Sequence, residues 1–292
     1  MTRAPVAATV PEATTVQSRS IEELKELARK ARVAVLNMTY DAGSGHPGGS
    51  FSMQDFLVSL YYNHMHMSPE LVDDPNRDVF VLSKGHCAPG LYAILGEQGY
   101  YDKKEFRRLR RLGGLLQGHV DRKIPGIEMS TGSLGMGLGF ANGVALAKRA
   151  AGHTGRAIVV LGDGELQEGN IWESAMTAPH YKLDNVWCIV DWNKVQIDGP
   201  CEDVKGIDPV GAKFAAFGWH VIEADGHDMA AVEAAYAEAE QITGKPVCFV
   251  FDTKKGGGVS FMEGKADYHG RALTQEEMVA AMKELGEDWE VA

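Results

Sequence analysis

The sequence predicts an α/β fold, in which a parallel sheet is flanked by helices on both faces. Short apolar runs recur along the second half of the chain, and their apolar residues do not alternate with polar ones. Segments with helical spacing of apolar side chains separate these runs. Strands that are apolar at every position, with helices between them, are typical of a parallel sheet covered on both sides.

The first predicted helix begins after Ser20, because Ser20 and Glu23 have the spacing of a capping box. Apolar residues continue at helical spacing until the glycines of DAGSGHPGGS end the helix. We expect Ser52 to cap a second helix that runs to about His64. Residues 78–86, DVFVLSKGH, then predict a short buried strand that leads into a loop. A glycine-rich passage, TGSLGMGLGFANG, precedes the next helix.

Strands and helices alternate regularly through the second half of the chain. The predicted strands are residues 157–161, 186–190, 220–224 and 247–251, and the predicted helices between them are residues 167–181, 210–217 and 229–242. Thr274 is placed to cap a last helix. Since no repeat or linker interrupts this pattern, we expect one domain over residues 20–292, after a disordered leader over residues 1–19.

Composition narrows the classes of partner. The 292 residues are 45% hydrophobic and carry a formal net charge of −11, which argues against nucleic acid or an anionic membrane surface as the main partner. No run approaches the roughly 18 to 20 apolar residues of a membrane span. The four cysteines form no CxxC pair and no metal-ligand spacing, which favours reduced thiols and a cytoplasmic location.

A lone carboxylate stands between two glycines at the end of one predicted strand, in VVLGDGEL. Asp163 follows the strand over residues 157–161, and Asn193 follows the next strand, 30 positions later, in DWNKVQIDG. Ligands of open parallel sheets bind beyond the carboxyl ends of the strands, so the two side chains can converge on one point. The alternative is a plain turn in which Gly-Asp-Gly serves only the backbone angles.

Oxygen ligands at this point suit a hard cation. Mg²⁺ commonly takes one or two protein oxygens and completes its shell with phosphate oxygens and water. Asp163, Asn193 and a backbone carbonyl near Val195 would leave room for a diphosphate. Gly162 and Gly164 would let the backbone approach a phosphate at the beginning of the following helix.

Four of the ten histidines stand next to glycine in loops predicted at this same edge. They are His46, His86, His119 and His269. Imidazole binds sugar hydroxyls and phosphate oxygens, and it titrates near neutral pH. We therefore interpret these four as site residues, and we assign His64, His66, His153 and His180 to structural or surface positions.

These motifs together resemble the transketolase family of thiamine diphosphate enzymes. GDG followed about 30 residues later by Asn is similar to the cofactor signature of that family. Further similar segments are SGHPGGS (44–50), LSKGHCAPGLYA (82–93), QGHVD (117–121), STGSLGMGLGFANG (130–143) and YHG (268–270). The resemblance covers most of residues 20–275 in the family's order. It implies the thiamine diphosphate-binding fold and the cofactors thiamine diphosphate and Mg²⁺.

The resemblance also implies roles for individual residues. The implied Mg²⁺ ligands are Asp163, Asn193 and Val195; the implied cofactor contacts are His86, Gly132, Ser133, Leu134, Asp163, Gly164, Glu165, Asn193 and His269; and the implied catalytic residues are His46, His86, His119, His269 and Glu168. Of the histidines, His46 and His119 would contact the sugar. Glu168 would join a network between two active sites of a dimer, or would only complement a helix dipole.

The matched motifs all belong to the diphosphate-binding domain of transketolases. The family's activating glutamate lies in a separate pyrimidine-binding domain, so the resemblance implies a two-subunit transketolase of which this chain is the N-terminal subunit. Such an enzyme transfers a two-carbon ketol unit from a ketose, a sugar phosphate or a similar anionic sugar, to an aldose. We expect an α2β2 assembly with a separate C-terminal partner subunit. The alternatives are the α subunit of a 2-oxo acid dehydrogenase and a non-catalytic cofactor-binding subunit.

A basic run, KKEFRRLRRLGG over residues 103–114, concentrates six cations. Such a run is typical of a solvated helix face. A second interpretation is that one of its arginines draws anionic sugars toward the site.

Overall fold

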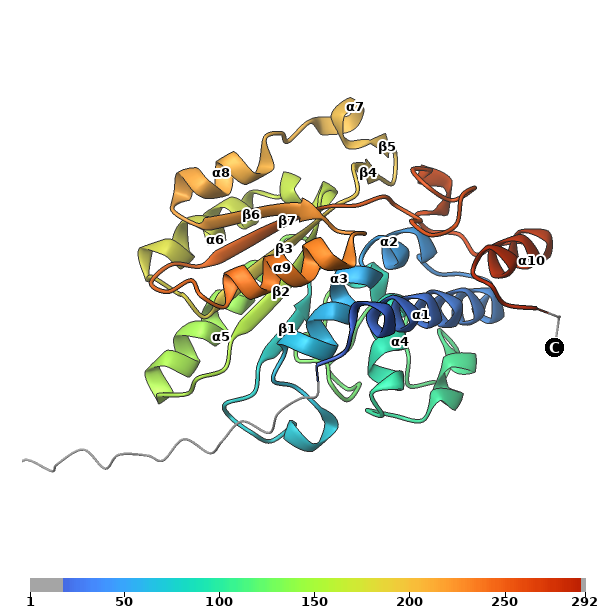
Figure 1. Ribbon diagram of the computed structural model, residues 1–292, viewed down its shortest axis with the longest axis horizontal. Coiled ribbons are helices and arrows are strands. Elements are labelled where there is room, and N and C mark those ends of the chain that lie inside the picture. The colour runs from blue at the N-terminus through green and yellow to red at the C-terminus, as the bar shows by residue number, and fades with distance from the viewer. Residues whose placement is uncertain (1–17, 290–292) are drawn as a thin grey trace, which may run out of the picture.

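The computed structural model describes residues 18–289, so the predicted leader lies almost entirely outside the described residues. Five parallel strands form the central sheet, in the order β1-β2-β3-β7-β6 (Figure 1). The strands are β1 (Val79–Leu82), β2 (Ala157–Gly162), β3 (Val186–Trp192), β6 (His220–Asp225) and β7 (Val247–Asp252). All four strand pairings are parallel, which confirms the predicted fold class.

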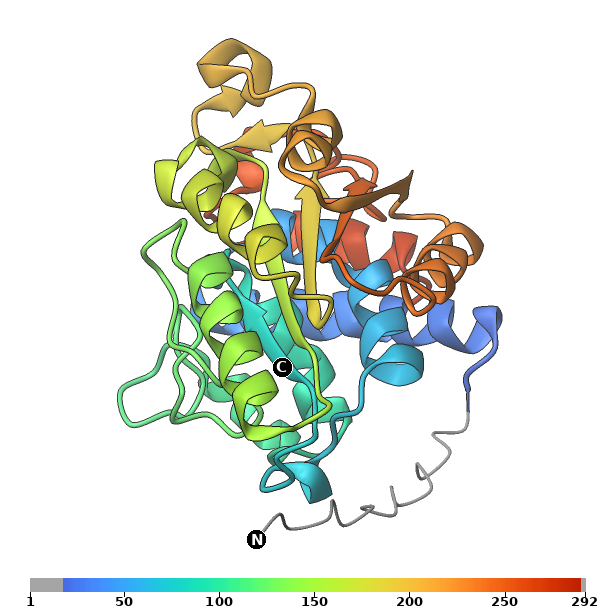
Figure 2. The ribbon, with the colours of Figure 1, turned by 90° about the vertical axis from the view of Figure 1, so that its left-hand side faces the viewer.

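Helices cover both faces of this sheet (Figure 2). On one side lie α1 (Ile21–Ala42), α2 (Pro47–Ser52), α3 (Gln54–Ser59), α4 (Ala88–Glu97) and α9 (Met229–Ala239). On the other side lie α5 (Gly137–Ala151), α6 (Gly169–His180) and α8 (Val210–Phe217). The short α7 (Cys201–Lys205) follows a small hairpin of β4 (Val195–Gln196) and β5 (Gly199–Pro200), and α10 (Gln275–Glu284) packs near α1. No helix within residues 18–289 is long and apolar enough to cross a membrane.

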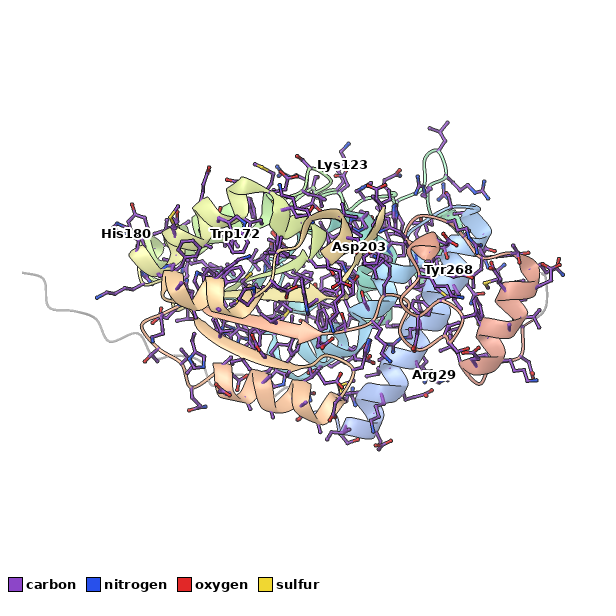
Figure 3. All side chains as sticks on the ribbon, turned by 90° about the horizontal axis from the view of Figure 1, so that it is seen from above. Arg29, Lys123, Trp172, His180, Asp203 and Tyr268 are labelled. Atoms are coloured by element: carbon purple, nitrogen blue, oxygen red, sulfur yellow. The ribbon has the colours of Figure 1, made fainter. Side chains whose placement is uncertain are left out.

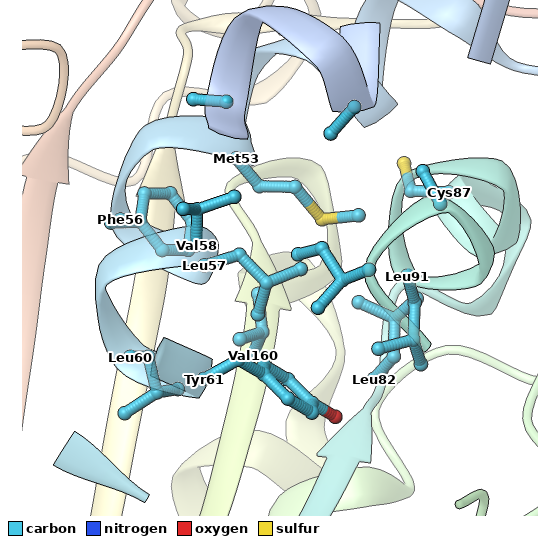
Figure 4. Packing of buried hydrophobic residues seen from close by; sticks show 14 of the residues in the cluster. Met53, Phe56, Leu57, Val58, Leu60, Tyr61, Leu82, Cys87, Leu91 and Val160 are labelled. Carbon is cyan, nitrogen blue, oxygen red and sulfur yellow. The ribbon is translucent and has the colours of Figure 1, made fainter. Parts of the chain in front are cut away.

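Alternate residues of each strand enter two separate cores. In β2, Ile158 and Val160 face the core beneath α3 and α4, whereas Val159 and Leu161 face the core beneath α5 and α6. Figure 4 shows Met53 and Leu57 packed beside Val160 in the first core. Because both faces of the sheet are buried there, β1 and β2 carry no charged residue, and β3 and β7 carry one only near the carboxyl end.

The ends of the long helices follow the predicted signals. Ser20 and Glu23 form the capping box of α1, and Gly43 ends this helix with a φ of 64°. Thr274 and Glu277 form a second capping box at the beginning of α10. These local hydrogen bonds can be predicted from the sequence because both partners lie within one helical turn.

The prediction for the second helix was wrong. The chain enters α2 at Pro47, a residue whose fixed φ suits a first helical position, and Ser52 is the last residue of α2 rather than a cap. The hydroxyl of Ser52 instead donates a hydrogen bond of 2.6 Å to Asp191. The segment continues as α3 and a π turn over Leu60–His64.

Two further helix boundaries differ from the predicted ones, and two helices, α4 and the short α7, were missed. Residues 167–181 contain the end of a 3₁₀ turn, Gly164–Gln167, before α6 begins, and α9 ends at Ala239 rather than at residue 242. Helix α4 carries no amphipathic pattern because nine of its ten residues are buried. A helix buried on all sides gives no apolar stripe for a sequence to reveal.

Candidate active site

Asp163 and Asn193 lie side by side at the carboxyl edge of the sheet. Strands β2 and β3 are neighbours in register, with Gly162 opposite Asp191, so the residues that follow each strand emerge together. Asp163 is 3% exposed and Asn193 is 5% exposed. Both line a cavity of about 310 Å³.

Most of the predicted site residues line this one cavity. They are His46, His86, His119, His269, Gly132, Leu134, Asp163, Gly164, Glu165, Asn193 and Val195. Ser133 and Glu168 do not line it, and both are exposed outside it. The fold therefore brings together residues from seven loops that are distant in sequence.

The Asp163 carboxylate is fixed by backbone donors. Its Oδ1 accepts a hydrogen bond of 2.7 Å from the N–H of Gly164, and its Oδ2 accepts one from the N–H of Lys194. Lys194 adopts a left-handed conformation with a φ of 66°, which turns the loop after Asn193 back toward Asp163. Burial, together with the nearby charge of Asp191, raises the pKa of Asp163 to about 6.

The few oxygen atoms at this edge of the sheet fit a cation that takes most of its ligands from a bound molecule or from water. Within residues 18–289 no three His, Cys, Asp or Glu side chains are grouped to hold a metal ion. Asp163, the amide oxygen of Asn193 and the carbonyl of Val195 supply hard oxygen ligands, as Mg²⁺ prefers. A β-carbon on Gly164 would stand 2.9 Å from Oε1 of Gln196, so Gly164 brings the backbone close to this side chain at the cavity wall.

A buried ion pair supports the loop that carries Asn193. The ammonium of Lys84 pairs with Asp191, and it also donates to the carbonyl oxygen of Gly49 at 3.0 Å. Asp191 further accepts hydrogen bonds from Ser52, Thr253 and the side-chain amide of Asn193. Burial alone would raise the pKa of Asp191, but the Lys84 charge and these donors outweigh it and lower the pKa. The Asn193 amide nitrogen is thus held by Asp191, and its oxygen accepts a hydrogen bond of 3.2 Å from the N–H of Val195, which leaves one lone pair of that oxygen for a cation.

Two buried lysines line the cavity. Lys84 and Lys255 are each 2% exposed, and both line it together with the carboxylates Asp163 and Glu165. Burial and the Lys84 charge lower the pKa of Lys255, whose Nζ lies 3.3 Å from Nδ1 of His269. Lys84 is already paired with Asp191, whereas Lys255 makes no ion pair within residues 18–289, so Lys255 is the cation that can pair with an anionic ligand such as a diphosphate.

The four histidines form one cluster. His46 lies centrally, with ring centroids 5.2 Å from His86, 5.5 Å from His269 and 6.2 Å from His119. His86 and His269 stack at 5.0 Å near the two lysines, while His119 stands at the exposed mouth. Tyr268, which Figure 3 shows beside α10, anchors His269 by donating to Glu277 of α10 at 2.9 Å.

Burial and neighbouring cations keep these histidines neutral. Burial, followed by the charge of Lys255, lowers the pKa of His269 to about 3. The pKa of His46 falls to about 4 for the same first reason, with His119 and Arg110 adding to it. The pKa values of His86 and His119 are also lowered, first by burial. A neutral imidazole has one donor and one acceptor nitrogen, so each ring can bind a hydroxyl group and accept a proton.

Two buried polar atoms of the cavity have no hydrogen-bond partner within residues 18–289. They are Nδ1 of His46 and Nε2 of Gln196. Unpaired buried groups are costly to a fold, and a polar ligand in the cavity would satisfy them.

Sequence reasoning missed four side chains of the cavity, Lys84, Lys255, Gln196 and Ile197. Lys84 stands inside the quoted SKGH motif, and Lys255 follows the last strand as Asn193 follows β3. The strand-end rule could have located Lys255. Lysines are ordinarily exposed, so nothing in the sequence indicated that Lys84 or Lys255 lies in a buried site.

The two carboxylates after Asp163 have different surroundings. Glu165 is buried and accepts hydrogen bonds from the backbone N–H groups of Gly135 and Gly162 and from the hydroxyl of Ser83. It ties the glycine-rich loop to the end of β2. Glu168 is exposed, and its side chain makes no hydrogen bond within residues 18–289.

A larger cleft of about 1,020 Å³ lies across the loop of Asn193 and Lys194. Its buried charges are already engaged, since Arg32 and His227 both bind Asp55. Nε2 of His227 also accepts a hydrogen bond from the backbone N–H of Lys254. The unpaired buried atoms of His46 and Gln196 lie in the cavity of about 310 Å³, and we therefore place the site in that cavity.

Known proteins are similar to this chain in sequence and fold. Residues 24–291 match the model of the family described as transketolase, thiamine diphosphate binding domain. The chain is 40% identical to the 6-deoxy-6-sulfo-D-fructose transketolase subunit SqwG of Clostridium sp. (strain MSTE9), over 90% of this chain and 96% of that protein. It is 36% identical to an apulose-4-phosphate transketolase subunit of Phocaeicola vulgatus, over 91% of this chain and 95% of that protein.

Single-chain transketolases match over a shorter part of their length. The human enzyme is 36% identical over 87% of this chain but only 41% of its own length. The transketolase structure from Campylobacter jejuni superimposes with a TM-score of 0.86 at 32% identity, over 92% of this chain and 44% of that one. The chain therefore belongs to the transketolase family, where it corresponds to the thiamine diphosphate binding domain.

Proposed function

We propose that this chain is the N-terminal, cofactor-binding subunit of a two-subunit transketolase. One observation carries the proposal: the two relatives named as transketolase subunits match this chain over 95% or more of their own length, whereas single-chain enzymes match over less than half of theirs. The enzyme transfers a two-carbon ketol unit from a ketose to an aldose. The family match disfavours a 2-oxo acid dehydrogenase subunit.

The cavity residues divide the work of holding thiamine diphosphate and Mg²⁺. Asp163, Asn193 and the Val195 carbonyl bind the cation, and Lys84 and Lys255 balance the diphosphate charge. His86 and His269 lie between these lysines and the cavity mouth, beside the reacting end of the cofactor. Gly132, Ser133 and Leu134 contact the pyrimidine side through their backbone.

When bound, the thiazolium carbon supplies the nucleophile that breaks and forms the carbon–carbon bond. The chain's own residues orient the sugar and move its protons. Neutral His46 and His119 hold hydroxyl groups near the mouth, and neutral His86 and His269 accept and return protons on the reacting oxygens. The depressed pKa values of these histidines keep them unprotonated at neutral pH.

A second protein completes the site. Two exposed apolar side chains line the cavity, Leu134 at 37% and Ile197 at 65% exposed, and Met136 and Phe140, close to Leu134 in sequence, are 48% and 37% exposed. Such a grouping is typical of a surface that another protein covers. Glu168 is free to engage a second copy across this surface. The α2β2 assembly and the cytoplasmic location stay predictions.

The two subunit relatives indicate the class of substrate. Their names specify a sulfo-sugar and a sugar phosphate, which both carry a tetrahedral anionic group. We propose an anionic sugar of this kind for the present chain.

Ketol transfer by a reconstituted enzyme tests the proposal. This chain, a candidate subunit with the pyrimidine-binding domain, and their mixture are each assayed with thiamine diphosphate, Mg²⁺ and a panel of anionic ketoses and aldoses. We expect activity from the mixture only. Decarboxylation of 2-oxo acids, full activity of this chain alone, or cofactor binding by the mixture without any transfer would each contradict it.

A further inference from the structure

One arginine of the basic run has no partner and stands near the cavity. Four of the six cations are engaged: Lys103 with Glu97, Lys104 with Asp102, Arg108 with Glu105, and Arg111 with the carbonyl oxygen of Asp41. The side chains of Arg107 and Arg110 make no hydrogen bond or ion pair within residues 18–289. Arg107 lines a separate groove beside α1, whereas the guanidinium of Arg110 lies beside Gly118, which precedes His119 of the histidine cluster.

The backbone fixes the position of Arg110. It follows Leu109, which is 1% exposed, and its N–H donates a hydrogen bond of 2.9 Å to the carbonyl oxygen of the buried Leu116. Arg110 also has a φ of 58°, the left-handed conformation that non-glycine residues rarely adopt. Strain of this kind concentrates at functional positions, and here it aims the side chain at one place.

The guanidinium of Arg110 lies over Gly118, directly before His119. A β-carbon on Gly118 would stand 3.1 Å from Cζ and 3.2 Å from Nε of Arg110, so the guanidinium packs closely on the backbone at this position. The carbonyl oxygen of His119 accepts a hydrogen bond of 3.0 Å from the hydroxyl of Tyr92, which fixes the neighbouring backbone. The free cation is thus set at the exposed rim that His119 occupies.

The charge of Arg110 acts on the cavity. After burial, it is the main cause that lowers the pKa of His119, and it contributes to the lowered pKa of His46. The guanidinium therefore directs its field toward the mouth of the site. An anion that lay between Arg110 and His119 would be attracted by this field.

We propose that Arg110 binds the distal anionic group of the sugar substrate, a phosphate or a sulfonate, and so determines specificity from within this subunit. The inference rests on the proposed transketolase function. The planar guanidinium fork matches two oxygens of a tetrahedral anion and can bind them together. The reacting end of the sugar would then lie deeper, at the stacked pair of His86 and His269.

Kinetics of the assembled two-subunit enzyme give the first test. In Arg110→Ala we expect the KM for an anionic sugar to rise about 10- to 100-fold, the scale of a lost charge-assisted hydrogen bond, with little change in kcat. The KM for a ketose without an anionic group should stay within about 2-fold. Arg110→Lys should fall between, because it keeps the charge and loses the fork. An equal rise in KM for both sugars would overturn the proposal.

Two further variants separate recognition from folding. Arg107→Ala removes the other unpaired arginine of the same run and should leave both KM values unchanged. Arg110→Gly deletes the same side chain but relieves the left-handed strain, so it should raise the melting temperature while it weakens the binding of the anionic sugar. The same loss in Arg107→Ala would show a general charge effect and contradict a specific site.

A binding measurement tests Arg110 without any activity. Inorganic phosphate or methanesulfonate is titrated into the full chain at constant pH, and the imidazole signals of His119 are followed by NMR in isotopically labelled protein. We expect a saturable change in the His119 chemical shifts that is lost in Arg110→Ala. The anion that binds more tightly identifies whether the sugar carries a phosphate or a sulfonate. No shift with either anion, or an equal shift in the variant, would refute the proposal even if ketol transfer itself is confirmed.

Discussion

Asp163 is a buried carboxylate whose surroundings favour the protonated form until a cation arrives. Its pKa is raised from 3.8 to about 6, chiefly by burial. The folded state therefore binds more protons than the unfolded state between these two values, so this group's contribution to the free energy of unfolding falls as the pH rises through that window. The expected loss is on the order of 3 kcal/mol, since each pKa unit corresponds to about 1.4 kcal/mol.

The Asp163→Asn variant tests whether the contribution of Asp163 to the free energy of unfolding falls as the pH rises. Without metal, the wild-type chain should lose stability relative to the variant between about pH 4 and pH 7, because Asn does not titrate. Mg²⁺ with thiamine diphosphate should restore only the wild type. Urea unfolding across this range in the presence of a chelator measures the difference, and Asp203→Asn on the exposed α7 corrects for the loss of one surface charge. A wild-type advantage that grows with pH would contradict the assignment.

The histidine cluster predicts two kinetic classes of variant. His119 lies at the mouth and His46 lies between it and the inner pair, so their Ala variants should mainly raise KM by about 10-fold, the loss of roughly one hydrogen bond. His86 and His269 lie beside Lys84 and Lys255, and their Ala variants should mainly lower kcat, by about 100-fold or more. Steady-state kinetics of the reconstituted enzyme separate the classes. If the outer pair lowered kcat and the inner pair raised KM, our role assignment would be wrong.

At the scale of single residues, the sequence predicts those side chains that follow the carboxyl ends of parallel strands, because these ends lie at one edge of the sheet. Asp163 and Asn193 could be predicted because parallel strands end together. Lys84 and Arg110 could not, because a sequence does not reveal which lysine finds a buried carboxylate or which arginine remains unpaired. Those facts depend on contacts between residues 84 and 191, or 110 and 118, which only the folded chain brings together.

Elements are joined at the site by Asp191, the carboxylate near the end of β3. It binds Lys84 after β1, Ser52 of α2 and Thr253 after β7. This network explains why Ser52, predicted as a helix cap, is buried instead. The apolar strands were predictable because burial on both faces produces an uninterrupted run of apolar residues in the sequence. Helix α4 and the contacts of Asp191 produce no periodic pattern of apolar residues.

The Lys84–Asp191 pair should be strongly coupled. Lys84→Met leaves an unpaired buried carboxylate, and Asp191→Asn leaves an unpaired buried ammonium, so each single variant should lose about 3–5 kcal/mol of unfolding free energy. The double variant should lose clearly less than the sum, by about 1–3 kcal/mol, as for residues in one network. Chemical denaturation of all four proteins measures this cycle. Additive losses would mean that the two charges do not stabilise each other.

On the scale of the whole molecule, this chain holds only one end of the proposed cofactor. In the proposed complex, the lysines and the Asp163 loop would hold the diphosphate, while Leu134 and Ile197 beside the mouth are exposed. A partner that covers the mouth would therefore also cover the cofactor's ring. The cofactor and the partner subunit would then each stabilise the same assembly, although neither contacts every part of it.

Cofactor and partner should consequently tighten each other's binding by the same factor, as thermodynamic linkage requires. We expect thiamine diphosphate with Mg²⁺ to raise the affinity between the two subunits by about 10- to 100-fold, within the usual range of such coupling. The partner should raise cofactor affinity equally, and calorimetry of both binding steps compares the two factors. In Asp163→Asn the cofactor effect should vanish, while the subunits should still associate without cofactor because the apolar rim is unchanged. If the wild-type subunits bound each other equally well with and without the cofactor, the cofactor would lie away from the interface, and the two-subunit site would be wrong.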